Sequence, residues 1–112
     1  MFRKVKLKGE VHLEKDEIFI FTTQLCDESI FSLKIPESFL EMEQQPKLGE
    51  LPVSCYLHVT QQAQQNNMCY IALPVPSLEF GKHITVPSHQ VVPIKASIKS
   101  FNVKKIINKI NT

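Results

Sequence analysis

The sequence predicts an all-β fold, a small antiparallel barrel of five or six strands that is OB-like or similar. Apolar and polar residues alternate with a period of two in residues 4–14, 31–35 and 51–60, as in strands with one buried face. Polar clusters, prolines and glycines interrupt this alternation at short intervals, as turns do. Helical signals are limited to one short segment near residues 36–43 and to the C-terminal end. This combination of elements is typical of small barrels.

Three strands are expected in the first 35 residues. Residues 4–14 alternate almost without a break, and Gly9 falls on the inward face, where a missing side chain permits a sharp bend or a close approach. Residues 18–23 are apolar on both sides and rich in β-formers, which predicts a strand covered on both faces. In the third strand Phe31, Leu33 and Ile35 share one face.

A helical turn and a long hairpin are expected next. Pro36 is suited to the first position of a helical turn over residues 36–43. Residues 51–60 alternate again, with Val53, Cys55, Leu57 and Val59 directed inward. Residues 61–67 are all polar apart from Ala63, and they predict a loop between this strand and its partner over residues 68–75.

The last third of the chain predicts short extended pieces and then a helix. Extended pieces are expected over residues 83–86 and 90–94, with prolines limiting them to sheet edges or strand ends. Four apolar residues then follow helical spacing, which predicts an amphipathic C-terminal helix over about residues 101–111: Val103, Ile106, Ile107 and Ile110. Neither a repeat nor a domain boundary is visible, so residues 1–112 are expected to form one domain.

Composition indicates a soluble cytoplasmic protein. The chain has 112 residues, enough for one hydrophobic core, and 43% of them are hydrophobic, close to the globular average. The N-terminus lacks the apolar core of a signal peptide, and no apolar run approaches the length of a transmembrane segment. Three cysteines without C-x-x-C spacing favour free thiols in a reducing compartment.

Charge is distributed unevenly along the chain. Residues 51–78 contain no Asp, Glu, Lys or Arg, although alternation directs half of the strand residues there outward. An uncharged outer face with Tyr and Met resembles the centre of a protein interface. We therefore expect a non-catalytic interaction module, a homo-oligomer or a subunit or adaptor of an assembly, that contacts its partner through Tyr56, His58, Met68 and Tyr70. Coverage of this face by another part of the same domain is the equally weighted alternative.

Lysine clusters support nucleic-acid binding as a second hypothesis. Lys4, Lys6 and Lys8 lie on one strand face, and the C-terminal region carries five lysines and no acidic residue. The tail lysines expected to contact an acidic partner or a nucleic acid are Lys99, Lys104, Lys105 and Lys109. A single-strand binder would also need exposed aromatic residues, such as Tyr56. The chain has only one arginine and no tryptophan, and both facts count against this hypothesis.

The sequence does not predict an enzyme, a metal site or a cofactor. Cys55 and His58 are three residues apart in a strand, so their side chains point to opposite faces and do not converge on a metal ion. Neither a G-x-S-x-G nucleophile elbow nor a glycine-rich phosphate loop is present.

One short segment resembles a motif of PilZ domains. Residues 27–32, Asp-Glu-Ser-Ile-Phe-Ser, resemble the D-x-S-x-x-G turn of that family, and Arg3 lies upstream. PilZ domains are six-stranded barrels that often end in a helix and bind cyclic dinucleotides. Here Leu7 stands where the family's R-x-x-x-R clamp has its second arginine, and Ser32 replaces the glycine. The resemblance implies a degenerate PilZ-like barrel that has lost its ligand.

Overall fold

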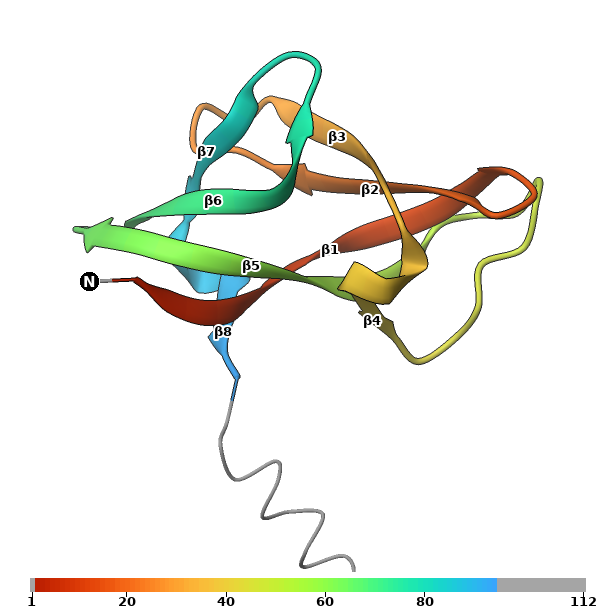
Figure 1. Cartoon of the computed structure of the whole chain (residues 1–112), viewed down its shortest axis with the longest axis horizontal. Coiled ribbons are helices and arrows are strands. Elements are labelled where there is room, and N and C mark those ends of the chain that lie inside the picture. Colours follow the sequence, from red (N-terminus) through yellow and green to blue (C-terminus); the bar gives the residue numbers. More distant parts are fainter. Residues whose placement is uncertain (1, 95–112) are drawn as a thin grey trace, which may run out of the picture.

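The alternating segments form eight strands in one curled antiparallel sheet (Figure 1). The computed structural model describes residues 2–94. In chain order the strands are β1 (Arg3–Lys15), β2 (Ile18–Gln24), β3 (Ile30–Ile35), β4 (Leu40–Met42), β5 (Val53–Gln65), β6 (Met68–Ser77), β7 (Gly81–Pro87) and β8 (Val91–Pro93). Two 3-10 turns, η1 (Glu37–Phe39) and η2 (Ser88–Gln90), precede β4 and β8. The described part of the chain is thus a curled antiparallel half-barrel. It agrees with the predicted all-β class, although the described sheet does not close into the expected barrel because β3 and β7 remain its two edges.

The pairing of β1 with β5 is the centre of the sheet. The strand order is β3-β2-β1-β5-β6-β7, and the two short strands join its central pair, β4 along β5 and β8 along β1. One edge of β1 is shared by two neighbours, because β8 pairs with residues 5–7 and β2 pairs from Glu10 onward. In the same way one edge of β5 pairs first with β4 and then with β6. The six strands of the main order match the predicted number.

The concave side of the sheet holds the hydrophobic core. Burying a large apolar side chain contributes about 1.5–3 kcal/mol, so this layer is the main source of stability. Side chains at alternate positions of the six main strands are buried there: Val5, Leu7, Val11, Phe19, Phe21, Phe31, Leu33, Ile35, Cys55, Leu57, Val59, Cys69, Ile71, Leu73, Ile84 and Val86. The rings of Phe31 and Phe80 lie 5.9 Å apart and connect β3 to the β6–β7 turn. The predicted inward apolar residues of residues 4–14, 31–35 and 51–60 are therefore confirmed, except that Leu13 and Val53 are only half-buried.

Gly9 permits a close approach between β1 and β2, as expected. A Cβ atom at this position would lie 2.5 Å from Cζ of Phe21 and still closer to the carbonyl oxygen of Thr22. The Phe21 ring thus occupies the space that a side chain at position 9 would need. This contact lies beside the point where the edge of β1 passes from β8 to β2.

Three sequence predictions are corrected by the structure. The helical turn over residues 36–43 ends at Phe39, and Leu40–Met42 form β4, because their backbone pairs with residues 55–57 of β5. The strand at residues 18–23 is not covered on both faces, since Ile18, Ile20 and Thr22 stay half-buried. The polar stretch after Thr60 is mostly strand, because residues 60–65 pair with β6 and only Asn66 and Asn67 form the turn. Asn66 adopts the expected left-handed backbone, with φ of 56°.

The C-terminal helix predicted over residues 101–111 lies outside the described residues, as do Lys99, Lys104, Lys105 and Lys109. Within residues 2–94, no helix has the length and apolar composition needed to cross a membrane.

Replacing Gly9 should destabilise the fold. We expect Gly9→Ala to lower the free energy of unfolding by about 1–3 kcal/mol, because the added methyl group overlaps Phe21 and the Thr22 carbonyl. Urea denaturation monitored by circular dichroism measures this change. Ser54→Ala, at an exposed position of β5, is the control and should change stability by less than about 0.5 kcal/mol. Equal stability of the two variants would refute the close approach.

Candidate functional site

The outer face of β5 carries the first two predicted contact residues. The alternation that buries Cys55, Leu57 and Val59 directs Tyr56 and His58 to the opposite side. His58 is exposed and Tyr56 is half-buried. Within the described residues this face is therefore partly open and lies outside the core.

Neighbouring strands place charges beside this uncharged strand. Lys8 of β1 pairs with Tyr56, and Lys6 pairs with His58. On the other edge of β5, Glu41 of β4 also pairs with Tyr56. The absence of charged residues from residues 51–78 is thus a property of that segment of the chain. The surface around Tyr56 and His58 does carry charges, because neighbouring strands supply them. To predict from the sequence that these charged residues lie beside Tyr56, the strand order would have to be known, and β4 was not predicted as a strand.

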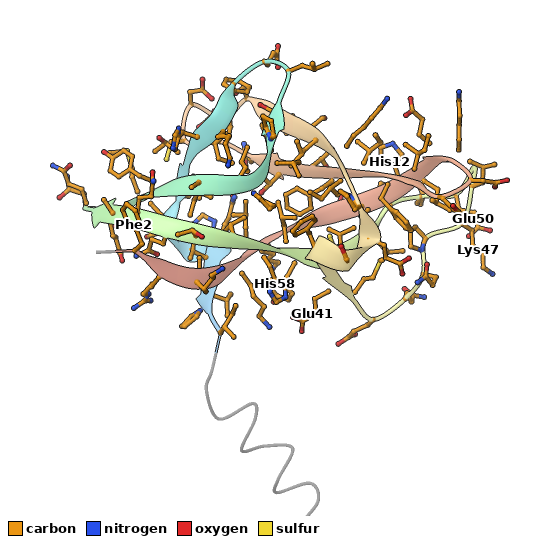
Figure 2. The ribbon with its side chains drawn as sticks, viewed as in Figure 1. Phe2, His12, Glu41, Lys47, Glu50 and His58 are labelled. Carbon is orange, nitrogen blue, oxygen red and sulfur yellow. The ribbon has the colours of Figure 1, made fainter. Side chains whose placement is uncertain are left out.

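Lys6, Glu41, Tyr56 and His58 form one cluster, here called the Lys6–Glu41 cluster. Lys6 Nζ lies 3.3 Å from Glu41 Oε2 and 4.9 Å from the centre of the Tyr56 ring. His58 Nε2 lies 3.4 Å from Glu41 Oε1, and Figure 2 shows these two side chains next to each other below β5. Surface ion pairs of this kind contribute about 0–1 kcal/mol, so the cluster adds little to the stability of the fold. The ammonium group of Lys6 also covers part of the Tyr56 ring.

Met68 and Tyr70 lie on a separate, uncharged part of the outer face. The β5–β6 ladder is irregular between Gln61 and Ala63 and then continues with Ala63 opposite Tyr70. Tyr70 also pairs with Thr85 of β7, and Met68 pairs with Gln65 on one side and Pro87 on the other. Both residues are half-buried, and their neighbours in the chain, Cys69 and Ile71, are in the core. Two rows of paired residues therefore cross β5, β6 and β7: Ala63–Tyr70–Thr85 and Gln65–Met68–Pro87. Neither row contains a charged side chain, and we call them the Tyr70 rows.

The structure therefore divides the four predicted contact residues into two groups. Tyr56 and His58 belong to the Lys6–Glu41 cluster, where charged side chains surround them. Met68 and Tyr70 belong to the Tyr70 rows, where the neighbours are neutral. The neutral outer surface that the sequence predicts persists only in the second group.

A hollow of about 410 Å³ lies where the edge of β1 passes from β8 to β2. Gln90 of η2 closes part of this gap, because its side-chain amide donates to Thr23 Oγ1 at 2.9 Å and to the Gln24 carbonyl at 3.0 Å. The Thr23 hydroxyl in turn donates to the Lys8 carbonyl at 2.9 Å. These hydrogen bonds join η2, β2 and β1 where no ladder hydrogen bonds connect them, which gives the hollow a structural role.

All three cysteines are free thiols. Burial, together with the negative charge of Glu10, raises the pKa of Cys55 to about 12. Burial also raises the pKa of Cys69, whose Sγ lies 3.6 Å from Gln61 Oε1. Both thiols therefore keep their protons at neutral pH and are poor nucleophiles. In the described part of the chain, no group of three or more His, Cys, Asp or Glu side chains is placed to hold a metal ion.

The segment that resembles the PilZ motif forms the turn between β2 and β3. The Asp27 carboxylate accepts hydrogen bonds from the hydroxyl and the backbone N–H of Ser29, the latter at 3.0 Å, and these bonds lower the pKa of Asp27. Glu28 adopts a left-handed backbone, with φ of 73°. The carboxylate thus serves to close its own turn.

Comparisons of the chain with protein-family models, with curated proteins and with solved structures give no significant match. The interpretation of the surface therefore depends on its geometry and charge.

Thiol labelling should separate the three cysteines. In the native protein at pH 8, we expect iodoacetamide to modify the half-buried Cys26 first, because Cys55 and Cys69 are buried and keep their protons. Mass spectrometry of the labelled peptides measures the rates, and all three thiols should react at similar rates in urea. Rapid labelling of Cys55 in the native protein would contradict its placement in the core.

Proposed function

We propose that the chain is a non-catalytic interaction module that acts as a subunit or adaptor of a protein assembly. The observation that supports this function most strongly is the presence of the Tyr70 rows on the outer face of β5, β6 and β7. Half-buried Tyr and Met side chains without neighbouring charges are characteristic of interface centres. The partner is a protein, either a second copy of this chain or another polypeptide.

The four predicted contact residues take different roles in this proposal. Tyr70 and Met68 form the centre of the contact, where a partner removes their remaining exposed area from water. Tyr56 and His58 lie at its margin with Lys6 and Glu41. Charged groups at the margin of an interface stay hydrated, and they influence the choice of partner and the association rate more than the affinity.

The buried cysteines support a role without catalysis. Cys55 and Cys69 are protonated in the core, so neither offers a thiolate to a substrate. Their free state is also compatible with the reducing cytoplasm expected from the sequence.

Nucleic-acid binding is the alternative function, and the exposed Lys4 and Lys8 on β1 favour it. The Lys6–Glu41 cluster counts against it. Lys6 already pairs with a carboxylate, and its ammonium group lies over the Tyr56 ring on which a base would stack. Glu10 adds an exposed negative charge to β1, the strand that carries Lys4 and Lys8.

Site-specific cross-linking tests the proposed surface. A photo-crosslinking amino acid replaces Tyr70 in one variant and the exposed Lys34 of β3 in the control. We expect a discrete cross-linked species from position 70 and none from position 34, because only the first lies within the proposed contact. Sedimentation of the unmodified protein then shows whether the partner is a second copy.

Two results would contradict the proposal. The first is the absence of any species specific to position 70. The second is an unchanged yield of that species when Met68→Glu is added, since a charge at the centre of the contact should disrupt it. Met68→Leu is the matched control, because it keeps an apolar side chain of similar volume.

A further inference from the structure

The β5–β6 hairpin extends beyond the start of β1. Pairing between β1 and β5 begins with Arg3 opposite Gln61, whereas β5 continues to Gln65. Figure 1 shows the end of β5 reaching past the start of β1. Residues 63–65, here called the β5 overhang, pair with β6 along one edge, and no described strand pairs with their other edge.

The turn that follows the β5 overhang determines which backbone groups face its open edge. Gln65 and Met68 flank a two-residue turn, and residues that flank such a turn form a hydrogen-bonded pair. Hydrogen-bonded and non-hydrogen-bonded pairs alternate along an antiparallel ladder, so Gln64 and Cys69 form a non-hydrogen-bonded pair. The N–H and C=O of Gln64 therefore point away from β6, toward the open edge.

The β5 overhang lacks the features that protect the two outer edges of this sheet. Natural proteins commonly block an open strand edge with Lys or Pro. β3 carries the exposed Lys34 and is followed by Pro36, and β7 contains Lys82 and ends at Pro87. The β5 overhang has neither a charged residue nor a proline, and its three residues are exposed. Its free backbone groups are therefore accessible to another strand.

We propose that the β5 overhang pairs antiparallel with the β5 overhang of a second copy of this chain. Gln64 lies opposite Gln64 of the second copy and exchanges two backbone hydrogen bonds with it, while Ala63 lies opposite Gln65. The sheets of the two copies then continue into each other across a two-fold axis. This inference rests on the proposed function, because it identifies the protein partner as a second copy and specifies how that copy binds.

The neutrality of the β5 overhang favours a second copy as the occupant. When two identical edges pair antiparallel, a charged edge places like charges close together, which opposes association. The overhang brings no charge to this pairing, and the nearest charged residue of the neighbouring strand, Arg3, lies opposite Gln61. Arg3 is therefore about 10 Å along the strand from the axis at Gln64. The two Gln64 side chains share one face, where each amide can both donate and accept a hydrogen bond.

The same pairing joins the Tyr70 rows of the two copies. Within one copy, Tyr70 pairs with Ala63 and Met68 pairs with Gln65. Because Ala63 of one copy lies opposite Gln65 of the other, the row through Tyr70 continues into the row through Met68 of the second copy. Ala63 is small, so the Tyr70 ring has room to reach Gln65 of the second copy. The dimer thus brings a second chain beside the proposed centre of the contact.

Sedimentation velocity of the full chain tests the pairing. We expect the average mass to rise toward that of a dimer as the concentration approaches about 1 mM, because so short an interface gives weak association. Gln64→Lys should weaken association about tenfold, since it places two like charges opposite each other. Ser54→Lys is the control, because it adds the same charge at an exposed position of β5 before the overhang, and it should leave association unchanged. Circular dichroism verifies that both variants keep the fold.

Disulfide formation tests the register of the pairing. Cα atoms of a hydrogen-bonded antiparallel pair are about 5.5 Å apart, a distance that a disulfide bridges, whereas diagonal neighbours are about 7–8 Å apart. In a Cys26→Ser background with oxidised glutathione as the oxidant, we expect Gln64→Cys to form an intermolecular disulfide about tenfold faster than Gln65→Cys. Electrophoresis without reductant measures both rates.

Three outcomes would overturn the inference. They are a chain that stays monomeric at the highest concentration, equal weakening of association by Gln64→Lys and Ser54→Lys, and equal disulfide rates from positions 64 and 65. A monomeric chain that forms the species specific to position 70 with another polypeptide would leave the proposed function intact and refute only the self-pairing. Association that is lost in Gln64→Lys, without cross-linking from position 70, would support the self-pairing and refute the Tyr70 rows as the contact.

Discussion

The pairing of β1 with β5 determines where every other part of this structure lies. Its register runs from Arg3 opposite Gln61 to Val11 opposite Val53. This register places Val5, Leu7, Leu57 and Val59 in the core, and it places Lys4, Lys6 and Lys8 beside Thr60, His58 and Tyr56 on the outside. A slip of one residue would exchange the two faces of a strand, so the burial of these four apolar side chains holds the outer residues in place.

The same two strands explain why the sheet curls into a half-barrel. Each has one edge shared by two neighbours, β8 and β2 for β1, and β4 and β6 for β5. Gly9 allows β2 to approach β1 closely at the point where the neighbour of β1 changes from β8 to β2. Thr23 and Gln90 supply hydrogen bonds there that the β1–β2 and β1–β8 pairings do not provide. On the outer side, β4 brings Glu41 to the cluster, and β7 places Thr85 beside Tyr70. The proposed contact surface therefore depends on strand order as much as on the residues of the β5–β6 hairpin.

Period-two alternation was sufficient to predict the long strands, because a half-buried strand must alternate wherever one face meets the core. It identified Val5, Leu7, Phe31, Leu33 and Leu57 as inward residues. It did not identify β4, because a three-residue strand after Pro36 is stabilised by distant pairing with β5, and its own sequence carries no strand signal. The charges around Tyr56 were missed for the same reason: Lys6 and Glu41 are 35 residues apart in the chain, and only the tertiary structure brings them together. The neutral surface around Tyr70 was predictable because both flanking strands, β5 and β7, are also poor in charge at the paired positions.

Cross-strand nuclear Overhauser effects in the full chain test the β1–β5 register most directly. The structure predicts contacts between backbone protons of the directly paired residues Lys4 and Thr60, and of Thr60 and Ala72. Together these contacts would establish the row Lys4–Thr60–Ala72, which separates the charged cluster from the neutral surface. Contacts that instead pair Lys4 with Val59 or Gln61 would show a register shifted by one residue. Such a shift would turn the proposed outer face of β5 toward the core and contradict the whole account.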